Sequence, residues 1–233
     1  MLQFNRYGGA LKGAREINMI YKFVNRCSDS LDYIQALEPQ HMSYALSRAM
    51  NRTIGGWGLD HPPERCLRGS YEAREYAYLG DMIRPPVEGS PARFEILGGA
   101  WTHDAILEID GYPGRVIRTV HSLFRTPGNK GVGRAIMESI IRDAERDSVE
   151  LVLDAYDDHN LSAFYTRLGF APYGHVEFNE EYVSDRWEPN DGRPDVKAWY
   201  RGTYKAPYQG RFETYEGLLA ARDNFLVTNN WRQ

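Results

Sequence analysis

A glycine-rich stretch in the middle of the chain carries the clearest chemical signal in the sequence. It reads Leu123-Phe124-Arg125-Thr126-Pro127-Gly128-Asn129-Lys130-Gly131-Val132-Gly133-Arg134-Ala135 and joins a predicted strand to a predicted helix. Such a junction directs backbone N–H groups and the positive end of a helix dipole at one point, which suits a phosphate or pyrophosphate. Gly131 and Gly133 let the backbone approach a ligand, and Lys130 and Arg134 add positive charge. The stretch has neither the Gly-Lys-Ser/Thr end of a Walker A loop nor a full G-x-G-x-x-G, so a plain helix-capping loop is the alternative.

The elements around this stretch predict a mixed α/β architecture with one central sheet. The clearest helix is 132–144, where apolar residues recur at helical spacing. Gly111 to Gly114 predicts a hairpin turn between two strands. The predicted strands are 32–37, 93–97, 105–109, 115–124, 149–154, 170–178 and 196–204. The predicted helices are 38–50, 70–79, 132–144, 161–168 (ending at Gly169) and 213–222.

Several segments together resemble the GNAT N-acetyltransferase superfamily. The glycine-rich stretch resembles motif A of that family, Q/R-x-x-G-x-G/A at a strand-to-helix junction. Tyr165-Thr166-Arg167-Leu168-Gly169-Phe170 resembles its motif B, and the turn from Asp157 to Ala163 resembles the asparagine-containing turn before that motif. Tyr33 to Pro39 resembles its first strand and turn. The resemblance implies a GNAT-like mixed central sheet flanked by helices over residues 31–204, with an N-terminal extension at 1–30 and a C-terminal extension at 205–233.

The resemblance also implies a binding site for acetyl-CoA. The strand that ends at Leu123 would splay from its neighbour, and its backbone would pair with the pantetheine arm at His121, Ser122 and Leu123. The pyrophosphate would be held by the loop amides of Asn129, Lys130, Gly131, Val132, Gly133 and Arg134, and Asn160 would contribute from the later turn. The Gln or Arg position of motif A falls on Gly128 without a gap, or on Arg125 with a three-residue insertion. The family's Asn position falls on Asp158, two residues ahead of Asn160.

Three side chains are candidates for the chemistry that the resemblance implies. Tyr165 would lie beside the thioester sulfur and protonate the leaving thiolate, the alternative being that it only packs. His121, on the strand that would line the cleft, suits the general base because a neutral imidazole accepts a proton near pH 7. Glu108 and Asp110, on the adjacent strand, are the alternative bases and would act through a water molecule.

An acidic segment bears on the acceptor of the acetyl group. Between residues 177 and 195 there are seven acidic side chains against only Arg186 and Arg193. In a GNAT-like fold this connection lies near the acceptor side, where an acidic rim attracts a cationic substrate such as a polyamine, an aminoglycoside or a Lys-rich peptide. The commoner alternative is a solvated acidic loop.

Composition limits the class of protein. The chain has 233 residues, 42% of them hydrophobic, and a net charge of −4, which is ordinary for a globular protein and disfavours nucleic acid as the main partner. The two cysteines and six histidines show no ligand spacing, so no metal is expected. No run approaches the roughly 20 apolar residues of a membrane helix, and the N-terminus lacks a signal peptide, so we expect no membrane partner and a cytoplasmic location.

The sequence therefore predicts an acetyl-CoA-dependent N-acetyltransferase that transfers an acetyl group directly to a primary amine on a small molecule or a protein. The alternative is a catalytically inactive GNAT-like binding or structural protein within a larger assembly. Apolar residues in the two terminal segments keep a homo-oligomer or such an assembly open, because they could cover either the acceptor cleft or another subunit.

Overall fold

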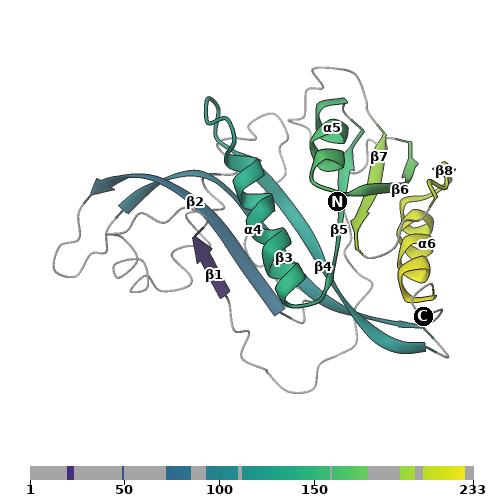
Figure 1. Ribbon diagram of the computed structural model, residues 1–233. Coiled ribbons are helices and arrows are strands. Elements are labelled where there is room, and N and C mark those ends of the chain that lie inside the picture. Colours follow the sequence, from purple (N-terminus) through teal and green to yellow (C-terminus); the bar gives the residue numbers. More distant parts are fainter. Residues whose placement is uncertain are drawn as a thin grey trace.

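A computed structural model describes residues 20–23, 49, 72–84, 93–109, 112–157, 159–177, 195–202 and 207–228. Its strands form one sheet, in the order β1-β2-β3-β4-β5-β7-β6-β8 (Figure 1). The strands are β1 (Ile20–Phe23), β2 (Glu72–Arg84), β3 (Arg93–Ile109), β4 (Tyr112–Arg125), β5 (Glu150–Tyr156), β6 (Ala171–Val176), β7 (Val196–Arg201) and β8 (Arg211–Phe212). The helices are α4 (Val132–Arg146), α5 (His159–Arg167) and α6 (Tyr215–Thr228). Within these residues no helix is long and apolar enough to cross a bilayer.

The connections explain why the sheet is mixed. β2, β3 and β4 pair antiparallel in sequence order, as strands joined by short connections can. The chain then crosses over through α4, and β5 pairs parallel with β4. On the far side of β5, the strands β7 and β6 return to antiparallel pairing. The parallel pair β4–β5 therefore lies in the middle of the sheet. In the chain, the glycine-rich stretch and α4 connect these two strands.

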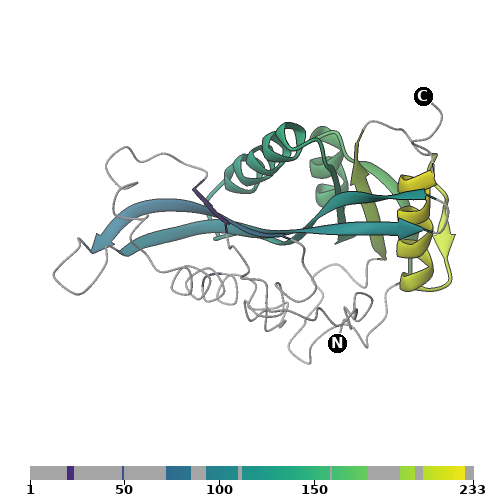
Figure 2. The same cartoon turned by 90° about the horizontal axis from the view of Figure 1, so that it is seen from below.

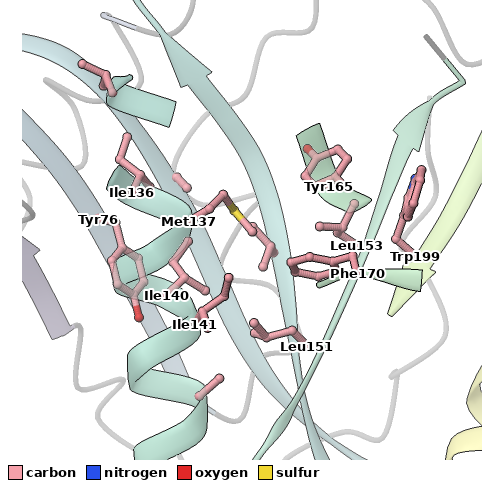
Figure 3. Close-up of a cluster of buried hydrophobic side chains, with 14 residues drawn as sticks. Tyr76, Ile136, Met137, Ile140, Ile141, Leu151, Leu153, Tyr165, Phe170 and Trp199 are labelled. Carbon is pink, nitrogen blue, oxygen red and sulfur yellow. The ribbon is translucent and has the colours of Figure 1, made fainter. Parts of the chain in front are cut away.

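Each face of the sheet is covered by its own core. Figure 2 shows α4 and α5 on one side of the long strands. The core on that side is formed largely by α4, which buries Ile136, Met137 and Ile140 completely, together with Leu151, Leu153 and Trp199 of the sheet (Figure 3). The core on the other face contains Ile117, Val152 and Tyr200, and α6 packs against it through Leu218, Leu226 and Val227. Successive residues of β4 and β5 thus alternate between the α4 face and the α6 face.

The predicted mixed α/β sheet flanked by helices is confirmed, and the elements predicted from residue 112 onward agree within a few residues, apart from the end of α6, which continues to Thr228. The division at residues 30 and 204 stays a prediction. Beyond residue 204, β8 pairs with β6 and α6 packs on the sheet. The strand predicted at 32–37 and all of the helix predicted at 38–50 except Ala49, which is helical, lie outside the described residues.

Two predictions near the start of the sheet were wrong. The helix predicted at 70–79 is not formed, because the described part of this stretch, from Glu72, belongs to the strand β2. Arg74, Glu75, Tyr76 and Ala77 are all buried, so both faces of β2 are covered and the sequence lacks the alternation that marks a half-exposed strand.

The strands predicted at 93–97 and 105–109 are one strand, β3. The glycines between them look like a break, but Gly98 lies where the strand passes under α4. A Cβ atom there would lie 2.6 Å from Val132 Cγ1 and 2.7 Å from the Phe124 carbonyl oxygen. The absence of a side chain at Gly98 therefore allows close packing and does not end the strand.

A buried ion network fastens the C-terminal end of α4 to β2, β3 and β4. Arg118 is completely buried and donates to both oxygens of Asp104, at 2.6 and 2.8 Å, and to Asp147 Oδ2 at 3.0 Å. Arg74 forms ion pairs with the same two carboxylates. Nearby, Tyr76 donates to Asp143 Oδ2 at 2.8 Å.

We expect the Arg118→Met variant to lose about 3–5 kcal/mol of unfolding free energy, because a buried carboxylate loses its main partner. Chemical denaturation followed by circular dichroism measures this. The control is Arg134→Met, which removes the exposed Arg134–Glu138 pair on α4 and should cost less than about 0.5 kcal/mol. Equal losses in the two variants would contradict a structural role for the buried network.

Candidate active site

The strands β4 and β5 separate in the middle of the sheet. Only three residue pairs join them: Ile117 with Glu150, Arg118 with Leu151, and Thr119 with Val152. β4 nevertheless continues to Arg125, still paired with β3, and β5 continues to Tyr156, still paired with β7. In Figure 3 the two strands diverge toward the end where Tyr165 lies. An extended ligand could pair with backbone groups along this opening.

A bulge in β4 lies at the opening. Between the pairs Trp101–His121 and Gly99–Phe124, β4 has one residue more than β3. Ser122 in this bulge has φ +54°, a left-handed conformation that is unfavourable for a residue with a side chain. The bulge changes the direction of the backbone at Ser122 and Leu123, two of the three residues predicted to pair with pantetheine.

The glycine-rich loop follows the bulge and ends at the exposed N-terminus of α4. Gly131 is the N-cap of α4, with φ +86°, and among the described residues no side-chain hydrogen bond caps this end of the helix. The first helix donor that bonds back to a carbonyl is Ala135, whose N–H lies 3.0 Å from the Gly131 oxygen. A Cβ atom at Gly128, Gly131 or Gly133 would have no neighbour within 4 Å. The loop therefore offers helix N–H groups facing open space, as an anion site requires.

Other hydrogen bonds hold the loop in place within the protein. Thr126 donates from its backbone N–H to the Leu97 carbonyl at 2.8 Å, and Asn129 Nδ2 donates to Thr126 Oγ1 at 2.7 Å. The backbone N–H groups of Asn129 and Lys130 also donate within the loop, to the Thr126 carbonyl at 3.3 Å and to the Gly128 carbonyl at 3.1 Å, so the prediction that these two amides face a ligand is not met. Lys130 and Arg134 are exposed, and Arg134 pairs with Glu138 at 2.7 Å.

Tyr165 lies on α5 beside the end of the opening. It is buried, with 6% of its surface exposed, and its ring lies 5.7 Å from the ring of Trp199 and 5.8 Å from that of Phe170. In Figure 3 its hydroxyl end points away from Trp199 and toward the β4 side. Burial, with a smaller effect of Asp154, raises the pKa of the phenol to about 12. At neutral pH Tyr165 is therefore protonated and able to donate.

His121 lies at the end of the paired part of β4, on the α6 face of the sheet. It is opposite Trp101 on β3, and its ring lies 4.8 Å from that of His103, which belongs to the next pair on the same face. Burial, and then His121, lower the pKa of His103 to about 2. His103 is therefore a permanently neutral neighbour of His121 and not a second base.

The structure does not bring all the predicted residues together. Glu108 is exposed and lies seven residues along β3 from Trp101, roughly 23 Å from the row of His121 in an extended strand, so it cannot share a site with His121. Asp110 and Asp158 lie outside the described residues. Asn160 is exposed in the first turn of α5.

The acidic segment is described only at its two ends. Glu177 forms an ion pair with Arg211, and Asp195 Oδ2 lies 3.4 Å from His175 Nε2. Whether this segment forms an acidic rim therefore stays a prediction. Within the described parts of the chain there is no group of three or more His, Cys, Asp or Glu residues that could hold a metal ion.

Asp154 on β5 is a polar residue at the opening to which sequence reasoning gave no role. It accepts from the Tyr215 hydroxyl and from Arg222 Nη1, the latter at 3.2 Å. The available signal was an acidic residue at the end of the apolar run Leu151-Val152-Leu153, within a strand whose sequence indicates burial.

Comparison with solved structures matches this arrangement of strands and helices to acetyltransferases. NAA60 of Arabidopsis thaliana in complex with a bisubstrate analogue is 12% identical, with a TM-score of 0.48 over 72% of this chain and 96% of that chain. An acyl-CoA N-acyltransferase from Pseudomonas aeruginosa is 16% identical, with a TM-score of 0.43 over 72% and 94%. A GNAT family acetyltransferase from Elizabethkingia anophelis with acetyl-CoA bound is 16% identical, with a TM-score of 0.38 over 48% and 73%.

In this chain the opening between β4 and β5, the bulge at Ser122 and the glycine loop occupy one continuous path from the middle of the sheet to the N-terminus of α4. These low identities concern the arrangement of the backbone and leave the activity to be argued from the residues themselves. No family model matches the sequence, and no curated protein matches it.

Proposed function

We propose that the protein is an acetyl-CoA-dependent N-acetyltransferase. The observation that carries the proposal is that β4 and β5 stop pairing after Val152, while β4 leads on through a bulge to an uncapped helix N-terminus. A phosphate-bearing cofactor with an extended arm needs both features in this order. A helix-capping loop alone would not require the two central strands to separate.

Different residues between His121 and Arg134 would bind different parts of the cofactor. The backbone at His121, Ser122 and Leu123 would pair with the pantetheine arm, since the pairing of β4 with β5 ends at Thr119 in the described part of the chain. The N–H groups from Gly131 to Arg134 would hold the pyrophosphate, with the dipole of α4 behind them, since those of Asn129 and Lys130 are bonded within the loop. The loop glycines leave this space free, which fits a ligand that lies directly on the backbone.

Two side chains would move the protons of the reaction. Acetyl-CoA supplies an activated thioester that a neutral amine can attack. His121 would accept the proton that the amine loses as the C–N bond forms. Tyr165 would donate its phenolic proton to the sulfur as the C–S bond breaks, and its raised pKa keeps that proton available.

Isothermal titration with acetyl-CoA, CoA and ATP tests the cofactor site. We expect micromolar binding of acetyl-CoA and CoA, because both carry the pantetheine arm and the pyrophosphate, and no comparable binding of ATP. If none of the three binds, the glycine loop is only a helix cap, and the chain is better explained as a GNAT-like binding or structural protein. A cytoplasmic location and an oligomeric assembly stay predictions.

A further inference from the structure

His121 on β4 and Asp154 on β5 are each two residues beyond the last pair that joins these strands. The last pair on the α6 face is Thr119 with Val152. Continuing this register by two residues would set His121 against Asp154, about 7 Å farther along each strand. The two side chains are therefore the first on this face beyond the paired region, one on each side of the opening.

Two side chains of α6 hold the Asp154 carboxylate. Arg222 is buried, with 4% of its surface exposed, and Tyr215 belongs to the first turn of the same helix. Both donate to the Asp154 carboxylate, one to each oxygen. The side chain of Asp154 is still 20% exposed, against 5% for that of Arg222. A carboxylate that is anchored by buried donors and still partly open can receive a further donor from the open side.

The position of Asp154 also links it to Tyr165. After burial, the negative charge of Asp154 is what raises the pKa of the Tyr165 phenol. Asp154 is therefore close enough to influence the predicted general acid, although it faces the α6 side of β5. His121 and Asp154 thus lie beyond the last pair of β4 and β5 on the α6 face, and Tyr165 lies in the core of the α4 face.

We propose that Asp154, positioned by Tyr215 and Arg222 of the C-terminal helix, binds the ammonium group of a cationic amine acceptor across the opening from His121. This inference rests on the proposed acetyl transfer and names its substrate class. An alkylamine arrives protonated at neutral pH, so a fixed carboxylate attracts it and orients it by a charge-assisted hydrogen bond. His121 takes one proton from the ammonium and releases it to solvent, and the neutral amine attacks the thioester. His121 then accepts the second proton as the C–N bond forms, while Tyr165 protonates the leaving sulfur.

The test compares a cationic and a neutral acceptor in the Asp154→Asn variant. Spermidine is the cationic probe, and hydroxylamine is a nucleophilic amine that is largely neutral near pH 7. With acetyl-CoA as donor and thiol release as readout, we expect KM for spermidine to rise about 10-fold in the variant, with a much smaller change for hydroxylamine. An equal change for both probes, or none for spermidine, would show that Asp154 only anchors the tail helix.

A pair of tyrosine variants separates positioning from general packing of α6. Tyr215→Phe removes a hydroxyl that anchors α6 and bonds Asp154. Tyr173→Phe removes a hydroxyl that also anchors α6, through the Ala221 carbonyl at 3.2 Å, but does not touch Asp154. We expect KM for spermidine to rise about 3-fold in Tyr215→Phe and to stay unchanged in Tyr173→Phe. The same KM in the two variants would overturn the positioning role.

The outcomes are distinct from those of the proposed function. If the wild-type protein does not bind acetyl-CoA in the titration, the acetyltransferase proposal itself fails. If it binds acetyl-CoA and acetylates hydroxylamine but none of spermidine, kanamycin or a Lys-rich peptide, the cofactor site stands and the cationic acceptor is refuted.

Discussion

Replacing Tyr165 by Phe is expected to lower the turnover of acetyl transfer by about 100- to 1000-fold, which lies within the range of about 100- to 10,000-fold that a general acid contributes. The affinity for acetyl-CoA should change little, because the variant keeps the ring and its contacts with Phe170 and Trp199 and loses only the hydroxyl. Steady-state kinetics with spermidine, together with titration of acetyl-CoA, measures the two quantities separately.

The raised pKa of Tyr165 adds a second expectation to this experiment. Burial and then Asp154 raise the phenol pKa to about 12, so Tyr165 keeps its proton throughout the usable pH range. The wild-type turnover should therefore show no alkaline loss that is due to Tyr165, and any such loss belongs to another group.

Tyr173→Phe is the matched control for Tyr165→Phe, because Tyr173 is also 6% exposed and also sits in a core, on the opposite face of the sheet. Both variants delete one buried hydroxyl, so a general effect of that change on packing would appear in both. If Tyr165→Phe loses cofactor affinity and turnover to the same extent, Tyr165 is a packing residue.

The second half of the chain could be predicted because its signals are local. The helix at 132–146 has a single apolar face against the sheet, and Gly169 adopts φ +82° after α5, as a C-terminal cap does. The elements for which the sequence-based prediction was wrong are buried on both faces or packed unusually closely. From Arg74 to Ala77 both faces of β2 are buried, so this stretch gives no alternating pattern, and Gly98 resembles a break in the sequence although it marks the contact with α4.

The candidate site was predictable where it is made of backbone. A strand, a glycine loop and a helix that follow one another in sequence also follow one another in space, so the path from His121 to Arg134 needed no knowledge of the fold. Side chains from different strands could not be placed from the sequence alone. Glu108 is on the strand that pairs with β4, but it lies far from the pair that contains His121. Asp154 is placed at the opening by the end of the pairing between β4 and β5, and it is held there by two donors from α6.

The Gly131→Leu variant is expected to lose about 100-fold or more in affinity for acetyl-CoA. A side chain at Gly131 would meet no protein atom within 4 Å, so it would extend into the space assigned to the pyrophosphate. Blocking two charge-assisted hydrogen bonds of about 1.5 kcal/mol each accounts for a loss of this size. Isothermal titration of the variant with acetyl-CoA measures it directly.

Gly210 provides the matched control for this substitution, because the two glycines share the same backbone conformation and the same free space. Gly210 has φ +81°, and a Cβ atom there would likewise have no neighbour within 4 Å, but it lies ahead of β8, at the far edge of the sheet from the glycine loop. Leucine at either position forces a side chain into the left-handed region, at a cost of roughly 1–2 kcal/mol. Gly131→Leu and Gly210→Leu should therefore lose similar stability, and only the first should lose cofactor binding. If both variants keep the wild-type affinity for acetyl-CoA, the pyrophosphate does not bind at this loop. The proposed acetyl transfer would then lose its main support, which is the succession of strand opening, bulge and helix N-terminus.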